Sequence, residues 1–112
     1  MSEEKLITTI LDELAQAQQA WQDGREGRAR VNARRAVGLA VRISKKAGVQ
    51  NGFGKNAVTD LRRLVMDENN PHHVRLLAMK LVARENDPVA RTQNPHGDAL
   101  QLIRWLLPDF PA

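Results

Sequence analysis

Basic side chains are concentrated in one segment of this chain, and their spacing points to binding of an anionic partner. Residues 24–48 hold eight lysines and arginines against one glutamate, for a net charge of +7 in a chain of +4 overall. Each residue of a helix advances by about 100° around the helix axis, so several of these basic residues fall on one outer side of the expected helix. We call this side the predicted anion-binding face. The face comprises Arg28, Arg35, Gly38, Arg42, Lys45 and Lys46. Such side chains suit phosphate groups, so RNA or another anionic ligand is a predicted partner.

Gly38 is the unusual member of this face, because glycine inside a helix costs about 1 kcal/mol relative to alanine. It lies between Arg35 and Arg42 and is expected to leave a bare backbone notch on the outer side of the helix. A phosphate-bearing ligand settling there is one interpretation, and a helix of a second subunit crossing there is another. The third is a solvated cationic face with no further role. The pattern alone leaves all three open.

Two other groupings of chemistry-bearing residues are excluded by their spacing. Gly48 and Gly54 resemble a phosphate-binding loop, but five residues separate them instead of four. Asn56 also replaces the hydroxyl residue, and no strand precedes the loop. His72 and His73 are adjacent, so their side chains diverge on a helix and cannot share a metal ion. Because the chain also has no cysteine, we expect neither a metal site nor a cofactor.

The elements that must position these residues are helices, because apolar residues recur with helical spacing nearly throughout the chain. No segment alternates with period two for long enough to form a strand. The expected helices cover about residues 3–23, 28–47, 56–67, 71–85 and 96–107. The first two are long and joined by a short glycine-containing turn, which favours an antiparallel hairpin. The sequence therefore predicts a single all-α domain over residues 1–112, built as a bundle of four to five helices.

The second of these helices is expected to lie at the centre of the bundle. Its inward face is an alanine-rich seam that lets neighbouring helices approach closely. The seam comprises Ala29, Ala33, Ala36, Val37, Ala40, Ile43 and Ala47. Two later helices are predicted to start at an asparagine N-cap followed by proline in the first turn. These pairs are Asn70 with Pro71 and Asn94 with Pro95.

Composition indicates the cellular setting. The chain has 112 residues, of which 42% are hydrophobic, enough for one core without disulfide bonds. Its first residues are acidic, unlike those of a signal peptide, and no apolar run approaches the roughly 18 residues of a membrane span. We therefore expect a cytoplasmic protein that does not enter a membrane.

One segment, from Gly27 to Ala40, resembles the second helix of the HEPN superfamily; it reads GRARVNARRAVGLA. Proteins of that superfamily are small helical bundles, often dimeric. Many are metal-independent ribonucleases or partners of nucleotidyltransferases. Their signature is an arginine and a histidine separated by four to six residues, and Arg91 and His96 have four residues between them. The resemblance implies that His96 acts in acid–base catalysis while Arg91 stabilises charge on the transition state.

Self-association is the function that these features favour most. Gly38 offers a place for a second helix, and the C-terminal region has more apolar side chains than one face of a short helix can bury. These side chains are Ile103, Trp105, Leu106, Leu107 and Phe110. We therefore expect a non-enzymatic interaction protein that forms homo-oligomers, with a homodimer as the commonest closed form. The alternative is a HEPN-like RNA-binding domain or metal-independent ribonuclease that uses the basic face together with Arg91 and His96.

Overall fold

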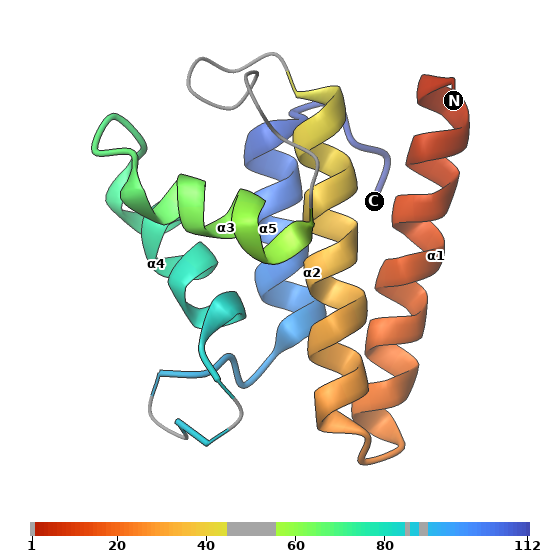
Figure 1. Cartoon of the computed structure of the whole chain (residues 1–112). Coiled ribbons are helices and arrows are strands. Elements are labelled where there is room, and N and C mark those ends of the chain that lie inside the picture. Colours follow the sequence, from red (N-terminus) through yellow and green to blue (C-terminus); the bar gives the residue numbers. More distant parts are fainter. Residues whose placement is uncertain (1, 45–55, 85, 88–89) are drawn as a thin grey trace.

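Five α-helices make up the part of the chain that the structure, a computed structural model, describes: residues 2–44, 56–84, 86–87 and 90–112 (Figure 1). In chain order they are α1 (Glu3–Gln22), α2 (Glu26–Ile43), α3 (Ala57–Met66), α4 (His72–Val82) and α5 (Pro95–Leu106). No strand occurs among these residues, and none of their helices is both long and apolar enough to cross a membrane. The predicted all-α bundle is confirmed.

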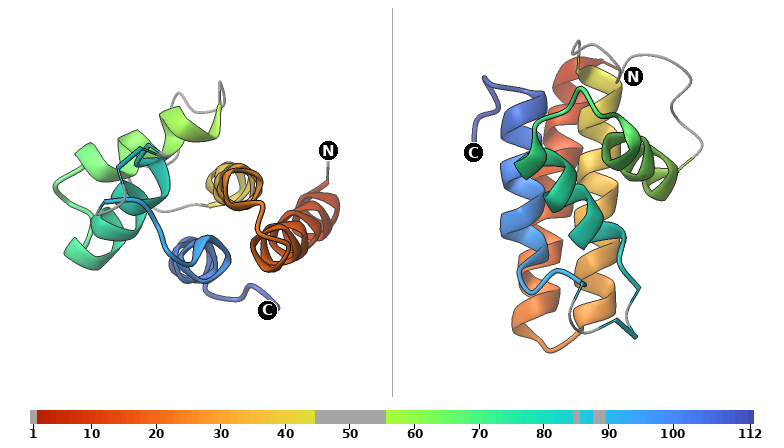
Figure 2. Two further views of the ribbon diagram at one scale, coloured as in Figure 1. Left: turned by 90° about the horizontal axis from the view of Figure 1, so that it is seen from below. Right: turned by 90° about the vertical axis from the view of Figure 1, so that its left-hand side faces the viewer.

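α2 lies at the centre of the bundle, as predicted, and contacts each of the other four helices. α1 and α2 form the expected antiparallel hairpin, and Gly24 in the turn between them adopts the left-handed conformation, with φ of 78°, that glycine tolerates best. Figure 2 shows α1, α2 and α5 nearly end on in its left panel, with α3 and α4 lying across them. α1, α2 and α5 therefore pack together as a three-helix bundle, and α3 and α4 lie on one side of it.

The alanine seam of α2 is buried in the core, as its sequence predicts. Ala33, Ala36 and Ala40 are fully buried, and Ile43 is half-buried. Ala47, the last predicted member, lies outside the described residues. The buried residues of α1 recur every three or four positions and face this core: Ile10, Leu14, Ala17 and Ala20. Small side chains on both helices permit the close contact on which the hairpin depends.

One of the two predicted Asn-Pro helix starts is confirmed, and the other is wrong. Asn94 caps α5, accepting a hydrogen bond from the Gly97 N–H at 3.1 Å, with proline in the first turn. α4 instead begins at His72, with Pro71 as its N-cap. The buried side chain of Asn70 donates to the carbonyl oxygen of Leu64 at 3.0 Å. Asn70 therefore satisfies a carbonyl at the end of α3 rather than an N–H at the start of α4.

Candidate functional site

The predicted anion-binding face of α2 is exposed in part. Arg28, Arg35 and Arg42 are all exposed, as the helical spacing predicts. Lys45 and Lys46 lie outside the described residues, because α2 is described only as far as Ile43 and its C-cap. Three arginines of the predicted face are therefore open to solvent.

Gly38 lines a hollow together with Arg35 and Arg42, as the sequence predicted, but it is not exposed on the outer side of the helix, so that part of the prediction was wrong. The residue is buried, because α3 packs against α2 at this point. A Cβ atom added to Gly38 would lie 3.1 Å from the Cβ of Ala57 and 3.3 Å from its Cα. The glycine lets two helices of one chain pack closely, which explains its presence without a ligand or a second subunit.

A hollow of about 350 Å³, which we call the mixed-charge hollow, remains beside Gly38 between α1, α2 and α3. Its charged lining residues are Glu13, Arg35, Arg42 and Asp60. Two carboxylates thus face two guanidinium groups, and the described lining has no excess of positive charge. The mixed-charge hollow is a weaker candidate for an anion than the sequence pattern alone indicates.

A larger hollow of about 500 Å³, which we call the arginine pocket, lies between α2, α3 and the end of α4. Four arginines line it: Arg30 and Arg34 of α2, Arg62 of α3, and Arg84 just beyond α4. The other lining residues are small or apolar, namely Gly27, Val31, Val58, Val82 and Ala83. Among the described residues that line the arginine pocket, none is acidic.

The fold brings these arginines together from three separate elements. Arg30 and Arg34 are four residues apart and therefore share one face of α2. Arg62 comes from the helix that packs on that face, and Arg84 comes from the chain as it leaves α4. Sequence analysis missed all four. The spacing of Arg30 and Arg34 was the only local signal, because the other two positions depend on tertiary packing.

Burial makes the charge in the arginine pocket costly. Arg30 is only 2% exposed, and Arg34 is half-buried, with its Nη1 donating to the carbonyl oxygen of Leu81 at 3.1 Å. Burial lowers the pKa of Arg34, and the neighbouring charge of Arg30 lowers that pKa further. Both causes disfavour the charged guanidinium, so a bound anion would stabilise this part of the fold.

The predicted pair of Arg91 and His96 flanks a buried polar clasp made by Thr92, Asp98 and Lys80. The Thr92 hydroxyl donates to the carboxylate of Asp98, which also pairs with the Lys80 ammonium at 3.2 Å. The Thr92 N–H donates to the Lys80 carbonyl oxygen at 3.0 Å. The clasp holds the start of α5 against α4, and sequence analysis missed it. Arg91 and His96 are both half-buried, and neither lines the arginine pocket; their catalytic role stays a prediction.

The adjacent histidines lie on the surface of the first turn of α4. His72 and His73 are both exposed, as expected. Across the described part of the chain, no three His, Asp or Glu side chains come together as ligands for a metal ion.

The apolar residues near the C-terminus pack largely within the chain. Ile103, Leu106 and Phe110 are buried, while Trp105 and Leu107 are half-buried. Fewer apolar side chains are therefore exposed near the C-terminus than the sequence predicted. Gly38, the other residue expected to contact a second subunit, packs against α3 of the same chain. The formation of homo-oligomers stays a prediction, and neither Gly38 nor the apolar C-terminal residues now argue for it.

No protein-family model, curated protein or solved structure matches this chain. The resemblance to the HEPN superfamily accordingly stays a prediction.

Proposed function

We propose that the protein binds a phosphate-bearing ligand in the arginine pocket. The observation that carries this proposal is the meeting of four arginines from three elements, with no acid among the described residues that line the pocket. Arginine remains charged at physiological pH and offers a planar set of donors that matches phosphate oxygens. A ligand with one or more phosphoryl groups is the partner that this chemistry fits best.

The electrostatic state of the pocket supports the same proposal. Four like charges repel one another, and the burial of Arg30 and Arg34 reduces the screening that water provides. An anion that enters the pocket replaces this repulsion with attraction and hydrogen bonds. The proposal thus explains why a fold would keep these arginines close together.

The rest of the lining indicates what kind of group accompanies the phosphate. Val31, Val58 and Val82 give the pocket an apolar wall beside its charges. A ligand with a phosphate and a flat or apolar portion fits both parts, and nucleotides are of this kind. The phosphate could belong to a free nucleotide or to an RNA strand, which is the partner expected under the alternative function.

Binding of labelled single-stranded RNA and of ADP tests the proposal, with inorganic pyrophosphate as the minimal probe. The variant Arg62→Gln with Arg84→Gln removes the two exposed arginines of the pocket. We expect it to weaken binding about tenfold, since a hydrogen bond to a charged group contributes on the order of 1.5–3 kcal/mol before solvent screening. The matched control, Arg35→Gln with Arg42→Gln, removes the same charge from the mixed-charge hollow. Equal weakening by the two pairs, or by neither, would contradict the proposal.

Salt dependence separates RNA from a free nucleotide as the source of the phosphate. If RNA is the ligand, loss of two phosphate contacts should flatten the slope of log affinity against log salt by roughly 1.4. If a nucleotide is the ligand, ADP should saturate the pocket and displace pyrophosphate, whereas RNA should bind weakly. Whether the ligand is RNA or a free nucleotide, the variant with Arg62→Gln and Arg84→Gln should lose more affinity than the control with Arg35→Gln and Arg42→Gln.

A further inference from the structure

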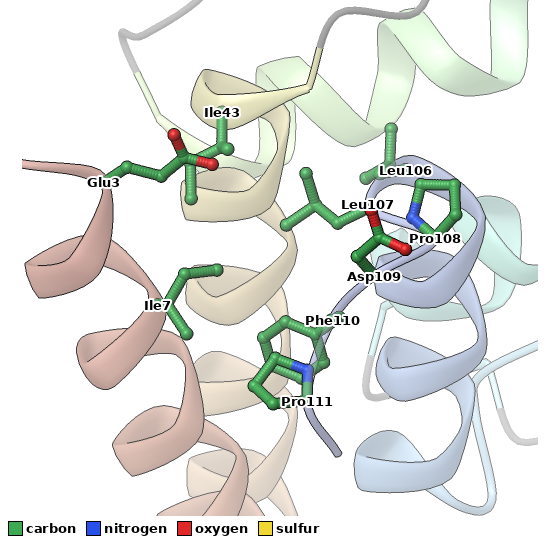
Figure 3. Close-up of a pocket in the computed structure, with 9 residues that line it drawn as sticks. All are labelled: Glu3, Ile7, Ile43, Leu106, Leu107, Pro108, Asp109, Phe110 and Pro111. Carbon is green, nitrogen blue, oxygen red and sulfur yellow. The ribbon is translucent and has the colours of Figure 1, made fainter.

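A second pocket, of about 530 Å³, lies where α1 begins and where α2 and α5 end, and it shares no residue with the arginine pocket. Figure 3 shows its side chains coming from both long helices of the hairpin and from the segment after α5. Ile7 of α1, Ile43 of α2 and Leu107 and Phe110 beyond α5 supply apolar walls. We call it the terminal pocket. Its interior is suited to an apolar group of modest size.

The wall formed by the C-terminal segment is tied in place. The N–H of Phe110 donates to the carbonyl oxygen of Leu107 at 2.9 Å, and the Phe110 side chain is only 8% exposed. Arg104 on α5 donates from both Nε and Nη2 to the carbonyl oxygen of Ala112, at 3.1 and 2.5 Å. The segment therefore folds back against α5, and the terminal pocket is formed before any ligand arrives.

The charged residues in the described lining of the terminal pocket are both acidic. Glu3 and Asp109 are its only charged residues within the described lining, and Figure 3 shows them coming from opposite sides, from α1 and from the C-terminal segment. Arg42 and Arg104 lie in the last turns of α2 and α5 but line no part of this pocket. The lining thus favours a positively charged group.

Helix termini add to this negative potential. Ile43 is the last residue of α2 and Leu106 is the last residue of α5, and both line the terminal pocket. The C-terminal end of a helix carries a partial negative charge, because its last carbonyl groups point outward. The N-terminus of α1 has the opposite sign, but Glu3 stands in its first turn and offsets it. Two helix C-termini and the carboxylate of Asp109 therefore add negative potential to one apolar pocket, together with Glu3, whose charge is partly offset by the N-terminus of α1.

We propose that the terminal pocket binds a small organic cation, a protonated amine attached to an apolar or aromatic body. The apolar walls would take the body, and the ammonium group would lie between Glu3 and Asp109. This proposal is independent of phosphate binding, because it rests on different residues and on charge of the opposite sign.

Titration with three naphthyl compounds of similar shape tests the proposal by calorimetry. Naphthylethylamine carries a positive charge, naphthylethanol is neutral, and naphthylacetate carries a negative charge. We expect affinity to fall in that order, because the apolar contribution is shared and only the charge differs. Equal affinity of the amine and the alcohol would contradict the proposed role of the carboxylates, and absence of saturable binding by the amine would overturn the site.

Variants locate the effect in the pocket. Glu3→Gln with Asp109→Asn should weaken amine binding roughly three- to tenfold, the range expected for two partly exposed ion pairs, and leave binding of the alcohol unchanged. The matched control is Glu4→Gln, which removes an exposed acid from the same helical turn but not from the pocket lining. We expect Glu4→Gln to retain wild-type affinity. A loss with Glu4→Gln as large as that of the double variant would contradict the assignment.

Discussion

Two of the hollows that border α2, the mixed-charge hollow and the arginine pocket, each contain two arginines of that helix, but their charge balance differs. In the mixed-charge hollow, Arg35 and Arg42 face the carboxylates of Glu13 and Asp60. In the arginine pocket, the two arginines of α2 meet Arg62 and Arg84 instead, and no described lining residue is acidic. A basic stripe on a helical wheel therefore does not locate an anion site. The side chains contributed by neighbouring helices decide which of the two basic surfaces also has carboxylates in its described lining.

The two hollows also differ in how they relate to the core. Gly38 at the mixed-charge hollow is a packing residue, closed over by Ala57 of α3. At the arginine pocket, burial lowers the pKa of Arg34, and the neighbouring charge of the buried Arg30 lowers that pKa further. Substitution of Gly38 should therefore change stability, whereas substitution of the exposed arginines of the arginine pocket should change binding.

The largest effect is expected from Gly38→Leu. The added side chain would collide with the Cα and Cβ of Ala57, which belong to another helix and cannot move aside cheaply. We expect the free energy of unfolding to fall by roughly 3 kcal/mol, at the upper end for overpacking a core. Urea melts measure this loss. Arg42→Ala, on the exposed side of the same helix, serves as control and should stay within about 0.5 kcal/mol of wild type; similar effects of the two substitutions would contradict the packing described for Gly38.

A smaller loss is expected from Asp98→Asn in the polar clasp. Asp98 accepts from the Thr92 hydroxyl and pairs with Lys80, so its carboxylate has both a hydrogen-bond donor and a counter-charge within the fold. Removing the carboxylate charge should lower the free energy of unfolding by about 1–2 kcal/mol. Thermal and urea melts of the variant provide the measurement. Unchanged stability would show that the clasp does not hold α5 to α4.

Arg62→Gln should leave stability within about 0.5 kcal/mol of wild type or raise it slightly. The substitution removes one of four like charges from the arginine pocket, and Arg62 itself is exposed. Arg28→Gln, an exposed arginine elsewhere on α2, is the matched control in urea melts. A loss of more than about 1 kcal/mol specific to Arg62→Gln would mean that this arginine supports the fold rather than a ligand.

No effect on RNA integrity is expected from His96→Ala. His96 lies in the first turn of α5, directly after Pro95, while Arg91 precedes the clasp, and neither residue lines the pocket proposed to hold phosphate. Labelled single-stranded RNA incubated with wild type and variant in EDTA should therefore remain intact with both. Cleavage by the wild type that disappears in His96→Ala would support the HEPN-like ribonuclease instead.

The sequence predicted the helices well because their signals are local. Apolar spacing located all five, and the alanine-rich seam correctly indicated that α2 is central. The sequence was less informative about which apolar side chains near the C-terminus are buried, because Ile103 and Leu106 are buried whereas Trp105 and Leu107 are only half-buried. Errors of this kind arise where the direction of a helix face depends on what packs against it.

The candidate site was harder to predict because it depends on contacts between distant segments. Helical spacing placed Arg35 and Arg42 on the surface correctly, but it could not show that α3 covers Gly38. Helical spacing also could not show that Arg62 of α3 and Arg84, just beyond α4, approach α2 in the folded chain. The charge excess of residues 24–48 did identify the helix involved, although the pocket forms on a different face.

Amide-resolved NMR during titration with inorganic pyrophosphate tests the central claim most directly, because it reports on both hollows in one experiment. If the arginine pocket is the anion site, the largest saturable shifts should fall in α2 over residues 27–34, in α3 over residues 58–62 and in the chain over residues 82–84. Amide signals near Arg35 and Arg42, which line the mixed-charge hollow, should shift less. Largest shifts around residues 35–42, or shifts that do not saturate anywhere, would contradict the account.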